Sequence, residues 1–339
     1  MANLMLTKQC NLHCSYCFAN EFVHRQSDVM NYENFLYCLN FLSSHPGERI
    51  GLIGGEPTLY PQLRQALARL IDSPFSSVCL FTNGILLDQY FNELRNSKFQ
   101  ILINLNHPHA SGAENYLHTL DNIREMIHHL YMRDQVGLSL NIHSPDQDFE
   151  YILEVLQLYG FRKLRLSIAV PNLEVNRGFD PLVYFKNMLP SVRSLLKRLL
   201  EMDVAPVFDC NYLPFCLLTN DDRVLFSKYK STMRRSNLLS TNPICAPVLD
   251  ILPDLHVVRC FGMSGVHKAW LPDFRSVDEL RRHFLAHIDA IAYRILPSEQ
   301  CRSCSDLICG RCSGGCYAYR QKAIQEANTM LDVRFGGIS

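Results

Sequence analysis

The first 170 residues alternate between short apolar runs and longer amphipathic stretches. We predict one strand in each of six apolar runs, which are NLMLT (3–7), RIGLIGG (49–55), SVCLFTNG (77–84), FQILINLN (99–106), VGLSLNIH (136–143) and KLRLSIAV (163–170). The stretches between them predict helices over 32–43, 61–72, 88–97, 113–133 and 149–159. Strands that alternate with helices form parallel β-α-β units. This half is therefore expected to be α/β, with either an open doubly wound sheet or a partly closed barrel.

Polar and glycine-rich residues follow each predicted strand directly. They are a cysteine loop after the first strand, then GGEP, TNG, NHP, NIHSP and PN after the next five. In parallel barrels the active site lies at the carboxyl ends of the strands. We therefore expect these six loops to meet at one end of the barrel, around its opening.

The pattern changes after residue 178. A long helix is predicted over about 180–202, and an irregular segment follows that holds nine of the fourteen cysteines: Cys210, Cys216, Cys245, Cys260, Cys301, Cys304, Cys309, Cys312 and Cys316. A segment with so many cysteine and turn residues cannot depend on apolar packing alone. We expect metal–thiolate bonds to be part of its fold.

Composition narrows the class of protein. The 339 residues contain 47% apolar residues, enough for about two domains, and 33 basic residues balance 33 acidic ones. This balance argues against a nucleic-acid partner. The amino-terminal residues lack the pattern of a signal peptide, and no apolar run approaches the roughly 18 residues of a membrane span. The expected location is the cytoplasm, with reduced thiols and no membrane partner.

Three cysteines, Cys10, Cys14 and Cys17, lie within eight positions of the first loop. Three thiolates can hold three corners of a cubane iron–sulfur cluster and leave the fourth iron open. The alternative is a structural zinc site completed by His13 or His24. The second loop, GGEP, could contact a ligand, because glycine lets the backbone approach closely and a carboxylate can accept a hydrogen bond from an ammonium group. The same four residues also suit a tight turn before a helix.

The CxxxCxxC spacing with Tyr16, joined by Gly54, Gly55, Glu56 and Pro57, resembles the signature of radical S-adenosylmethionine (SAM) enzymes. The resemblance implies a partial (β/α)6 TIM-like barrel with a [4Fe–4S] cluster whose open iron binds the methionyl group of SAM. One electron from the cluster then cleaves SAM to a 5′-deoxyadenosyl radical, which abstracts hydrogen from the substrate. The protein supplies orientation and excludes competing reactions.

Other side chains at the strand ends are candidates for binding the cofactor, although caps of the loops explain them about as well. These candidates are Thr82, Asn83, Asn104, Asn106, Asn141 and Arg165, of which Arg165 is expected to be a charge inside the barrel that needs a partner. Three loop histidines could act on substrate, namely His107, His109 and His143. Cys38 and Cys79 lie in apolar runs and are expected in the core.

The run CRSCSDLICGRCSGGC (301–316), with Cys245 and Cys260 before it, resembles the SPASM or twitch extension of radical SAM enzymes. This resemblance implies a small cysteine-rich α+β domain with one or two auxiliary [4Fe–4S] clusters. Candidate ligands are Cys245, Cys260, Cys301, Cys304, Cys312 and Cys316, with Cys309, Cys210 and Cys216 as further ones. Cys309 is inserted, Leu255 replaces a usual glycine, and no cysteine follows Cys316. Two closed clusters need eight thiolates, which requires Cys210 or Cys216.

We accordingly divide the chain into a radical SAM barrel (1–178), a linking helix (179–204), an auxiliary iron–sulfur domain (205–320) and a tail (321–339). Enzymes with this extension commonly modify peptides or proteins by crosslinking, thioether formation, epimerisation or oxidation. Sulfatase maturases usually have Asp after the second cysteine of the upstream pair, where this chain has Phe261 after Cys260.

The expected function is therefore a maturase of a ribosomally made peptide. Partners would be a peptide or protein substrate, an electron donor such as flavodoxin or ferredoxin and, because no fused recognition domain precedes residue 2, a separate leader-peptide-binding protein. One alternative is an enzyme acting on a small metabolite, since Gly336 and Gly337 faintly resemble the glycine pair of molybdopterin-precursor synthases. Another is a non-catalytic electron carrier or a zinc-structured binding protein.

Overall fold

The computed structural model describes residues 2–17, 23, 28–44, 48–170, 179–208, 213–228, 245 and 247–335. Six residues discussed above lie outside these ranges: His24, Pro171, Asn172, Cys210, Gly336 and Gly337. The stretch expected to be a tail is helical through Phe335, in helix α12 (Gln321–Phe335).

The described part of the chain contains a sheet of ten strands, which lie in the order β10-β9-β8-β1-β2-β3-β4-β5-β6-β7. From β8 to β7 all neighbouring strands are parallel. The strands are β1 (Ala2–Met5), β2 (Arg49–Ile53), β3 (Ser77–Thr82), β4 (Phe99–Asn104), β5 (Val136–Ile142), β6 (Lys163–Ile168), β7 (Ala205–Phe208), β8 (Asp250–Ile251), β9 (His256–Val258) and β10 (Lys268–Trp270). All six predicted strands are present, and the α/β prediction is confirmed.

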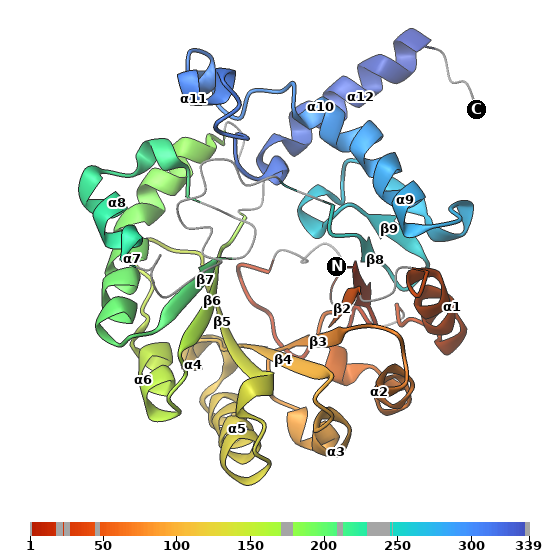
Figure 1. The fold of residues 1–339 in the computed structure, drawn as a ribbon, viewed down its shortest axis with the longest axis vertical. Coiled ribbons are helices and arrows are strands. Elements are labelled where there is room, and N and C mark those ends of the chain that lie inside the picture. The colour runs from red at the N-terminus through yellow and green to blue at the C-terminus, as the bar shows by residue number, and fades with distance from the viewer. Residues whose placement is uncertain are drawn as a thin grey trace.

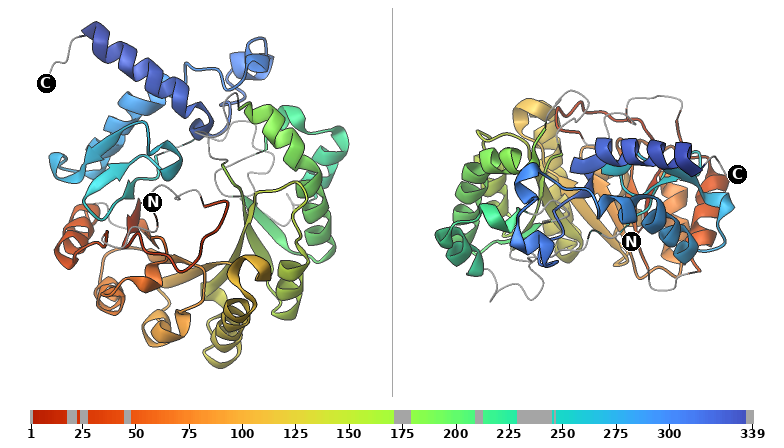
Figure 2. Two further views of the ribbon diagram at one scale, coloured as in Figure 1. Left: turned by 180° about the vertical axis from the view of Figure 1, so that it is seen from behind. Right: turned by 90° about the horizontal axis from the view of Figure 1, so that it is seen from above.

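The sheet curves into a partial barrel with helices on its outer side (Figure 1). The main helices are α1 (Tyr32–Leu42), α2 (Leu63–Ile71), α3 (Phe91–Leu94), α4 (Pro108–Ser111), α5 (Ala113–Arg124), α6 (Glu150–Leu158), α7 (Pro181–Glu201), α8 (Asn220–Ser227), α9 (Val277–Phe284), α10 (Ala290–Ala292) and α11 (Ser305–Ile308). The segment from α9 to α12 lies across the open side of the curve (Figures 1 and 2).

Alternation along the strands explains the two faces of the sheet. On β3, Val78 and Leu80 are fully buried, whereas Cys79 and Phe81 face the barrel interior and are partly exposed. Because successive side chains point to opposite faces, one face packs under the helices and the other lines the barrel. The prediction that Cys38 is a core residue is confirmed, but the same prediction for Cys79 was wrong because Cys79 is on the inner face.

The segment after residue 204 adds strands to the barrel sheet instead of forming a separate sheet. Strand β7 pairs with β6, and β8 pairs with β1 on the other side. The turn between β8 and β9 includes Leu255, which has a φ of +68°, and its N–H donates to Leu252 O at 3.1 Å. This left-handed conformation favours glycine, the residue type that the resemblance led us to expect there.

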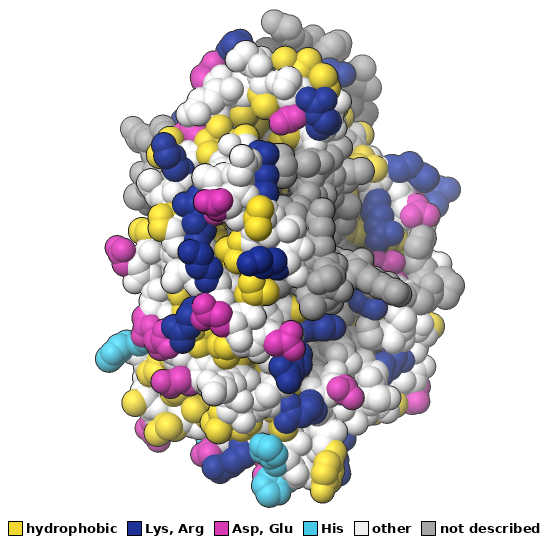
Figure 3. Space-filling model, turned by 60° about the vertical axis from the view of Figure 1, so that its left-hand side comes forward, with side chains coloured by type: hydrophobic (Ala, Val, Ile, Leu, Met, Phe, Trp, Pro, Cys, Tyr) yellow, Lys and Arg dark blue, Asp and Glu magenta, His cyan; other side chains and the backbone are white. Residues whose placement is uncertain are grey.

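Charges of both signs are interspersed over the face of the molecule drawn in Figure 3. This distribution agrees with the balance of 33 basic and 33 acidic residues in the sequence. Among the described helices, none combines the length and the apolar character that crossing a bilayer requires.

Three histidines form a stacked cluster: His267 in the loop before β10, His283 in α9, and His287 in the helical segment Leu285–Asp289 that follows α9. The Nε2 atoms of His267 and His283 lie 2.7 Å apart, and the rings of His283 and His287 stack with centroids 4.1 Å apart. The ring of Phe274 contacts His283 by its edge. Burial and the two neighbouring imidazoles lower the pKa of His283 to about 4.

We expect this cluster to make the protein less stable in mild acid. The unfolded imidazole titrates near about 6.5, so the unfolded state binds more protons, and the free energy of unfolding falls as the pH decreases from about 6.5 to about 4. His283→Phe should flatten this part of the profile, measured as the urea midpoint at pH 7 and pH 5. Leu158→Phe, at an exposed side chain that does not titrate, is the control and should leave the slope unchanged. Equal slopes for His283→Phe and the parent protein would contradict the prediction.

Candidate active site

The cysteine loop begins after β1 and lies against the glycine pair that follows β2. The N–H of Gly55 donates to Thr7 O at 2.8 Å. A Cβ atom on Gly55 would stand 2.2 Å from Gln9 O, and one on Gly54 would stand 2.7 Å from Thr7 O. Only glycine permits this approach of two backbones, so the pair fixes the path of the chain into Cys10.

Gly55→Ala is therefore expected to displace the cysteine loop. The added methyl group meets backbone atoms of Gln9, so we expect a loss of about 1–3 kcal/mol in the free energy of unfolding and a lower iron content after anaerobic reconstitution. Gly137→Ala on β5 is the matched control, because its Cβ would meet only Leu102 Cδ1 at 3.3 Å. The prediction fails if both variants retain parental iron content and stability.

The Glu56 carboxylate is buried, with 1% of the residue exposed. Its Oε1 accepts from Thr58 N–H at 3.1 Å, Thr58 Oγ1 at 2.7 Å and Thr82 Oγ1 at 2.7 Å, and its Oε2 accepts from Asn83 N–H at 2.8 Å. Burial raises the pKa of this carboxyl, and the four donors act in the opposite direction. Glu56 thus ties the turn after the glycine pair to the end of β3, which makes it a positioning residue in this arrangement.

Tyr16 joins the cysteine loop to the ends of β4 and β5. Its hydroxyl group is hydrogen-bonded to Asn106 and accepts from Asn104 Nδ2 at 3.1 Å. Asn141 Nδ2 in turn donates to Asn104 Oδ1 at 2.9 Å, and Cys14 Sγ lies 3.7 Å from Asn106 Oδ1. The structure therefore brings together Tyr16, one cysteine and the three asparagines that the sequence placed at separate strand ends.

The thiols of the loop are in a partly buried setting. Burial raises the pKa of Cys10 to about 11 and also raises the pKa of Cys14. Metal ligation requires the thiolate, so loading the site would release protons. Three soft thiolate donors in one loop fit an iron–sulfur cluster by their chemistry. Among the described residues, no three His, Cys, Asp or Glu side chains are arranged as a single-ion site.

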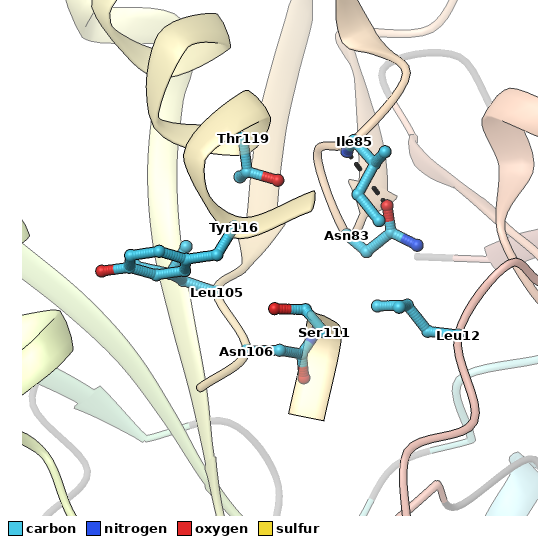
Figure 4. Close-up of a pocket in the computed structure, with 8 residues that line it drawn as sticks. All are labelled: Leu12, Asn83, Ile85, Leu105, Asn106, Ser111, Tyr116 and Thr119. Carbon is cyan, nitrogen blue, oxygen red and sulfur yellow. Dashed lines mark hydrogen bonds between the residues drawn. The ribbon is translucent and has the colours of Figure 1, made fainter. Parts of the chain in front are cut away.

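A small hollow lies beside this network (Figure 4), and its empty space of about 180 Å³ includes solvent at its open side. It is lined by the cysteine loop and by the ends of β3 and β4 with α4 and α5, through Leu12, Asn83, Ile85, Leu105, Asn106, Ser111, Tyr116 and Thr119. Asn83 Nδ2 also donates to Asn11 Oδ1 at 2.7 Å, and this hydrogen bond connects the cysteine loop to the end of β3 beside the hollow. Two of the lining residues, Asn83 and Asn106, were predicted from the sequence. The apolar ones were not, because single leucines in loops carry no signal.

Arg165 lies on the inner face of β6, as predicted for a charge inside the barrel. Its guanidinium donates to Ser139 Oγ at 3.0 Å and lies 5.7 Å from the centroid of the Phe81 ring. Ser139 is two residues before Asn141 on β5, so these contacts lie one layer deeper than the asparagine network.

The three loop histidines differ in their surroundings. His143 stacks on the Tyr16 ring with centroids 4.5 Å apart, and so covers the network from the side. His107 Nε2 lies 3.4 Å from Asp148 Oδ2, and its ring stacks on that of His109. His143 is therefore the histidine with a direct contact to the candidate site.

A buried arginine stands beside the cysteines of the second half. Arg259 is 0% exposed and forms a two-pronged ion pair with Asp289, with distances of 2.7 and 2.5 Å. It also donates to Cys245 Sγ at 3.4 Å and lies 5.1 Å from the centroid of Tyr317. Burial raises the pKa of the neighbouring Cys260 to about 12. This arginine could not be predicted from the sequence, because its partners are distant along the chain.

Residues 4–159 match the family model described as Radical SAM superfamily. The chain is 32% identical over 102 residues to GTP 3′,8-cyclase of Geobacter sulfurreducens, covering 29% of this chain and 31% of that protein. It is 26% identical over 191 residues to GTP 3′,8-cyclase of Chlorobaculum tepidum, covering 55% and 53%. The chain thus spans about half the length, or less, of these curated relatives.

Solved structures resemble a larger part of the chain. Streptococcus suis SuiB bound to S-adenosylmethionine matches with a TM-score of 0.64 at 15% identity, covering 95% of this chain and 73% of that one. Native anSMEcpe with bound AdoMet matches with a TM-score of 0.65 at 14% identity, covering 99% and 100%. At these identities the likeness shows the fold, and it extends through the cysteine-rich second half.

Proposed function

Because the chain carries a domain of the radical SAM superfamily, we propose that it is an enzyme that cleaves SAM reductively and abstracts hydrogen from a peptide. The family implies a [4Fe–4S] cluster and SAM. In this proposal Cys10, Cys14 and Cys17 hold the cluster, which supplies the electron for SAM cleavage. The observation that carries the proposal is the joining of the cysteine loop, the glycine pair and the asparagine network at one edge of the sheet.

Several residues would prepare this edge for the cofactor. The glycine pair sets the path of the loop, and Glu56 holds the end of β3 at the turn that follows that pair. Tyr16 connects the loop to Asn104 and Asn106, whose amides can donate to ribose or carboxylate oxygens. Rigid placement of this kind lets a protein hold a reactive group against one substrate position.

A peptide substrate is supported by similarity of fold over nearly the whole chain. A structure of SuiB bound to the precursor peptide SuiA matches with a TM-score of 0.61 and covers 95% of this chain. A structure of anSMEcpe with AdoMet and the Cp18Cys peptide matches with a TM-score of 0.64 and covers 98%. Both matches include the cysteine-rich segment, whereas the match to the family model ends at residue 159. We therefore propose auxiliary iron–sulfur ligation in that segment together with peptide modification.

The test is anaerobic. The reconstituted and reduced protein is incubated with SAM, and 5′-deoxyadenosine is quantified with and without deuterated precursor peptides encoded beside the gene. We expect cleavage of SAM and transfer of deuterium from one peptide into 5′-deoxyadenosine. Absence of SAM cleavage would overturn the enzymatic proposal, and cleavage without deuterium transfer from any such peptide would overturn the peptide substrate.

The sequence relatives favour a nucleotide as the second candidate substrate. Besides the two cyclases, an S-adenosylmethionine-dependent nucleotide dehydratase of a Thermoplasmatales archaeon is 32% identical over 88 residues, which cover 26% of this chain. All these matches cover at most 55% of the chain. Deuterated GTP in the same assay distinguishes the candidates, because only a nucleotide-modifying enzyme would move its deuterium into 5′-deoxyadenosine.

A further inference from the structure

We propose that Cys216 is the fourth ligand of an auxiliary iron–sulfur cluster whose other ligands are Cys301, Cys304 and Cys312. This inference rests on the proposed function, because it concerns the cluster content of the second half. It assigns to an upstream cysteine the position that a cysteine after Cys316 would otherwise fill, and residues 317–339 contain no cysteine.

The backbone arranges the three downstream cysteines as one compact unit. The N–H of Cys304 donates to Cys301 O at 3.2 Å, and the N–H of Cys312 donates to Asp306 O at 2.9 Å. The N–H of Gly314 donates to Cys312 Sγ at 3.3 Å, the kind of contact that stabilises a thiolate. This unit therefore supplies three thiols from a single turn and loop.

Helix α7 holds both parts of the proposed site. Asp180, the N-cap of α7, accepts from Ser298 Oγ at 2.6 Å, and Cys301 N–H donates to Ser298 O at 3.0 Å. Cys216 lies in the short 3-10 turn Phe215–Leu217, which packs against α7. Helix α11 lies next to the amino-terminal end of α7 in Figures 1 and 2. The two cysteine-bearing segments are thus brought to one helix from positions far apart in the sequence.

The thiols of the four proposed ligands also lie close enough for their charges to interact. Burial raises the pKa of the Cys216 thiol, and the neighbouring thiols of Cys301, Cys312 and Cys304 raise it further. Four thiols that influence one another across two chain segments form a donor set that suits a four-iron cluster.

Three other described cysteines of this half have different neighbours. Cys309 is exposed and interacts with Arg311. Cys245 and Cys260 lie beside the buried Arg259. Cys309 thus has an arginine as its charged neighbour, and we leave it out of the proposed set, although the spacings in the sequence allowed it.

The experiment uses the full chain with Cys10, Cys14 and Cys17 replaced by alanine, so that the remaining iron belongs to the second half. Cys216→Ser is introduced into this parent, and iron, sulfide and the Mössbauer spectrum are measured after anaerobic reconstitution. We expect a loss of about four irons per chain, or conversion of one cluster to a three-iron form. Cys309→Ser, also at an exposed cysteine, is the matched control and should retain the iron and spectrum of the parent.

Cys301→Ser provides the second variant. It should reproduce the spectrum of Cys216→Ser, and the double variant should lose no more than the about four irons of one cluster, since both substitutions affect the same cluster. Parental iron and an unchanged spectrum in Cys216→Ser would overturn the proposal, as would loss of clearly more than about four irons per chain in the double variant. The readout is independent of SAM cleavage: if intact protein fails to cleave SAM while Cys216→Ser still loses one cluster, the proposed function fails and the ligand assignment stands.

Discussion

Replacement of Cys14 by serine is expected to abolish formation of 5′-deoxyadenosine. Cys14 is the middle cysteine of the loop and lies near Asn106, at the centre of the Tyr16 network. A cluster held by only two cysteines would lose its site-differentiated iron, so the variant should lose about four irons per chain. We expect cleavage of SAM to fall to the background rate of the assay, measured by chromatography after anaerobic reduction.

The matched control for this loss is Cys38→Ser. Cys38 is a buried core residue on α1, so its replacement is expected to lower stability without changing the iron content. Full SAM cleavage by Cys14→Ser would contradict the prediction, and so would equal loss of iron in both variants.

Arg259→Met is expected to cost about 3–5 kcal/mol in the free energy of unfolding, because it leaves the Asp289 carboxylate without its buried partner. The substitution also removes the donor to Cys245 Sγ and the contact with Tyr317. The measurement is urea unfolding of variants prepared and reconstituted in parallel.

Two further variants check this explanation. Arg162→Met removes one side of an exposed ion pair with Asp203, whose side chains are 70% and 78% exposed, so its cost should be at most about 1 kcal/mol. The double variant of Arg259→Met with Asp289→Leu should recover part of the lost stability, since neither charge is then buried alone. Equal costs for Arg259→Met and Arg162→Met would contradict the prediction.

The pattern of apolar residues was sufficient to predict β1 to β6, because each is four to seven residues long and has a buried face under the helices. It was not sufficient for β7, which contains Pro206. Proline is tolerated on an edge strand but argues against a strand when only sequence is considered. Strands β8 to β10 contain two or three residues each, too few to show a period. These strands are found only through their pairing with distant partners.

The candidate site shows the same limit. The cysteine loop and the glycine pair could be located from their spacing, but the partners of Glu56 could not. Its carboxylate is satisfied by Thr82 and Asn83 at the end of the next strand, and that convergence exists only in the folded sheet. Likewise, the stacking of His143 on Tyr16 depends on the curvature that brings β5 to the first loop.

The central claim is that the cluster of Cys10, Cys14 and Cys17 binds SAM through its open iron. The most direct measurement is electron–nuclear double resonance of the reduced protein with SAM labelled with ¹⁵N in the amino group and ¹⁷O in the carboxylate. A variant that keeps these three cysteines and lacks Cys301 and Cys304 provides the sample with the auxiliary signal reduced. We predict strong hyperfine coupling of both labels to the cluster. Reduced cluster and bound SAM without coupling to either label would contradict the claim.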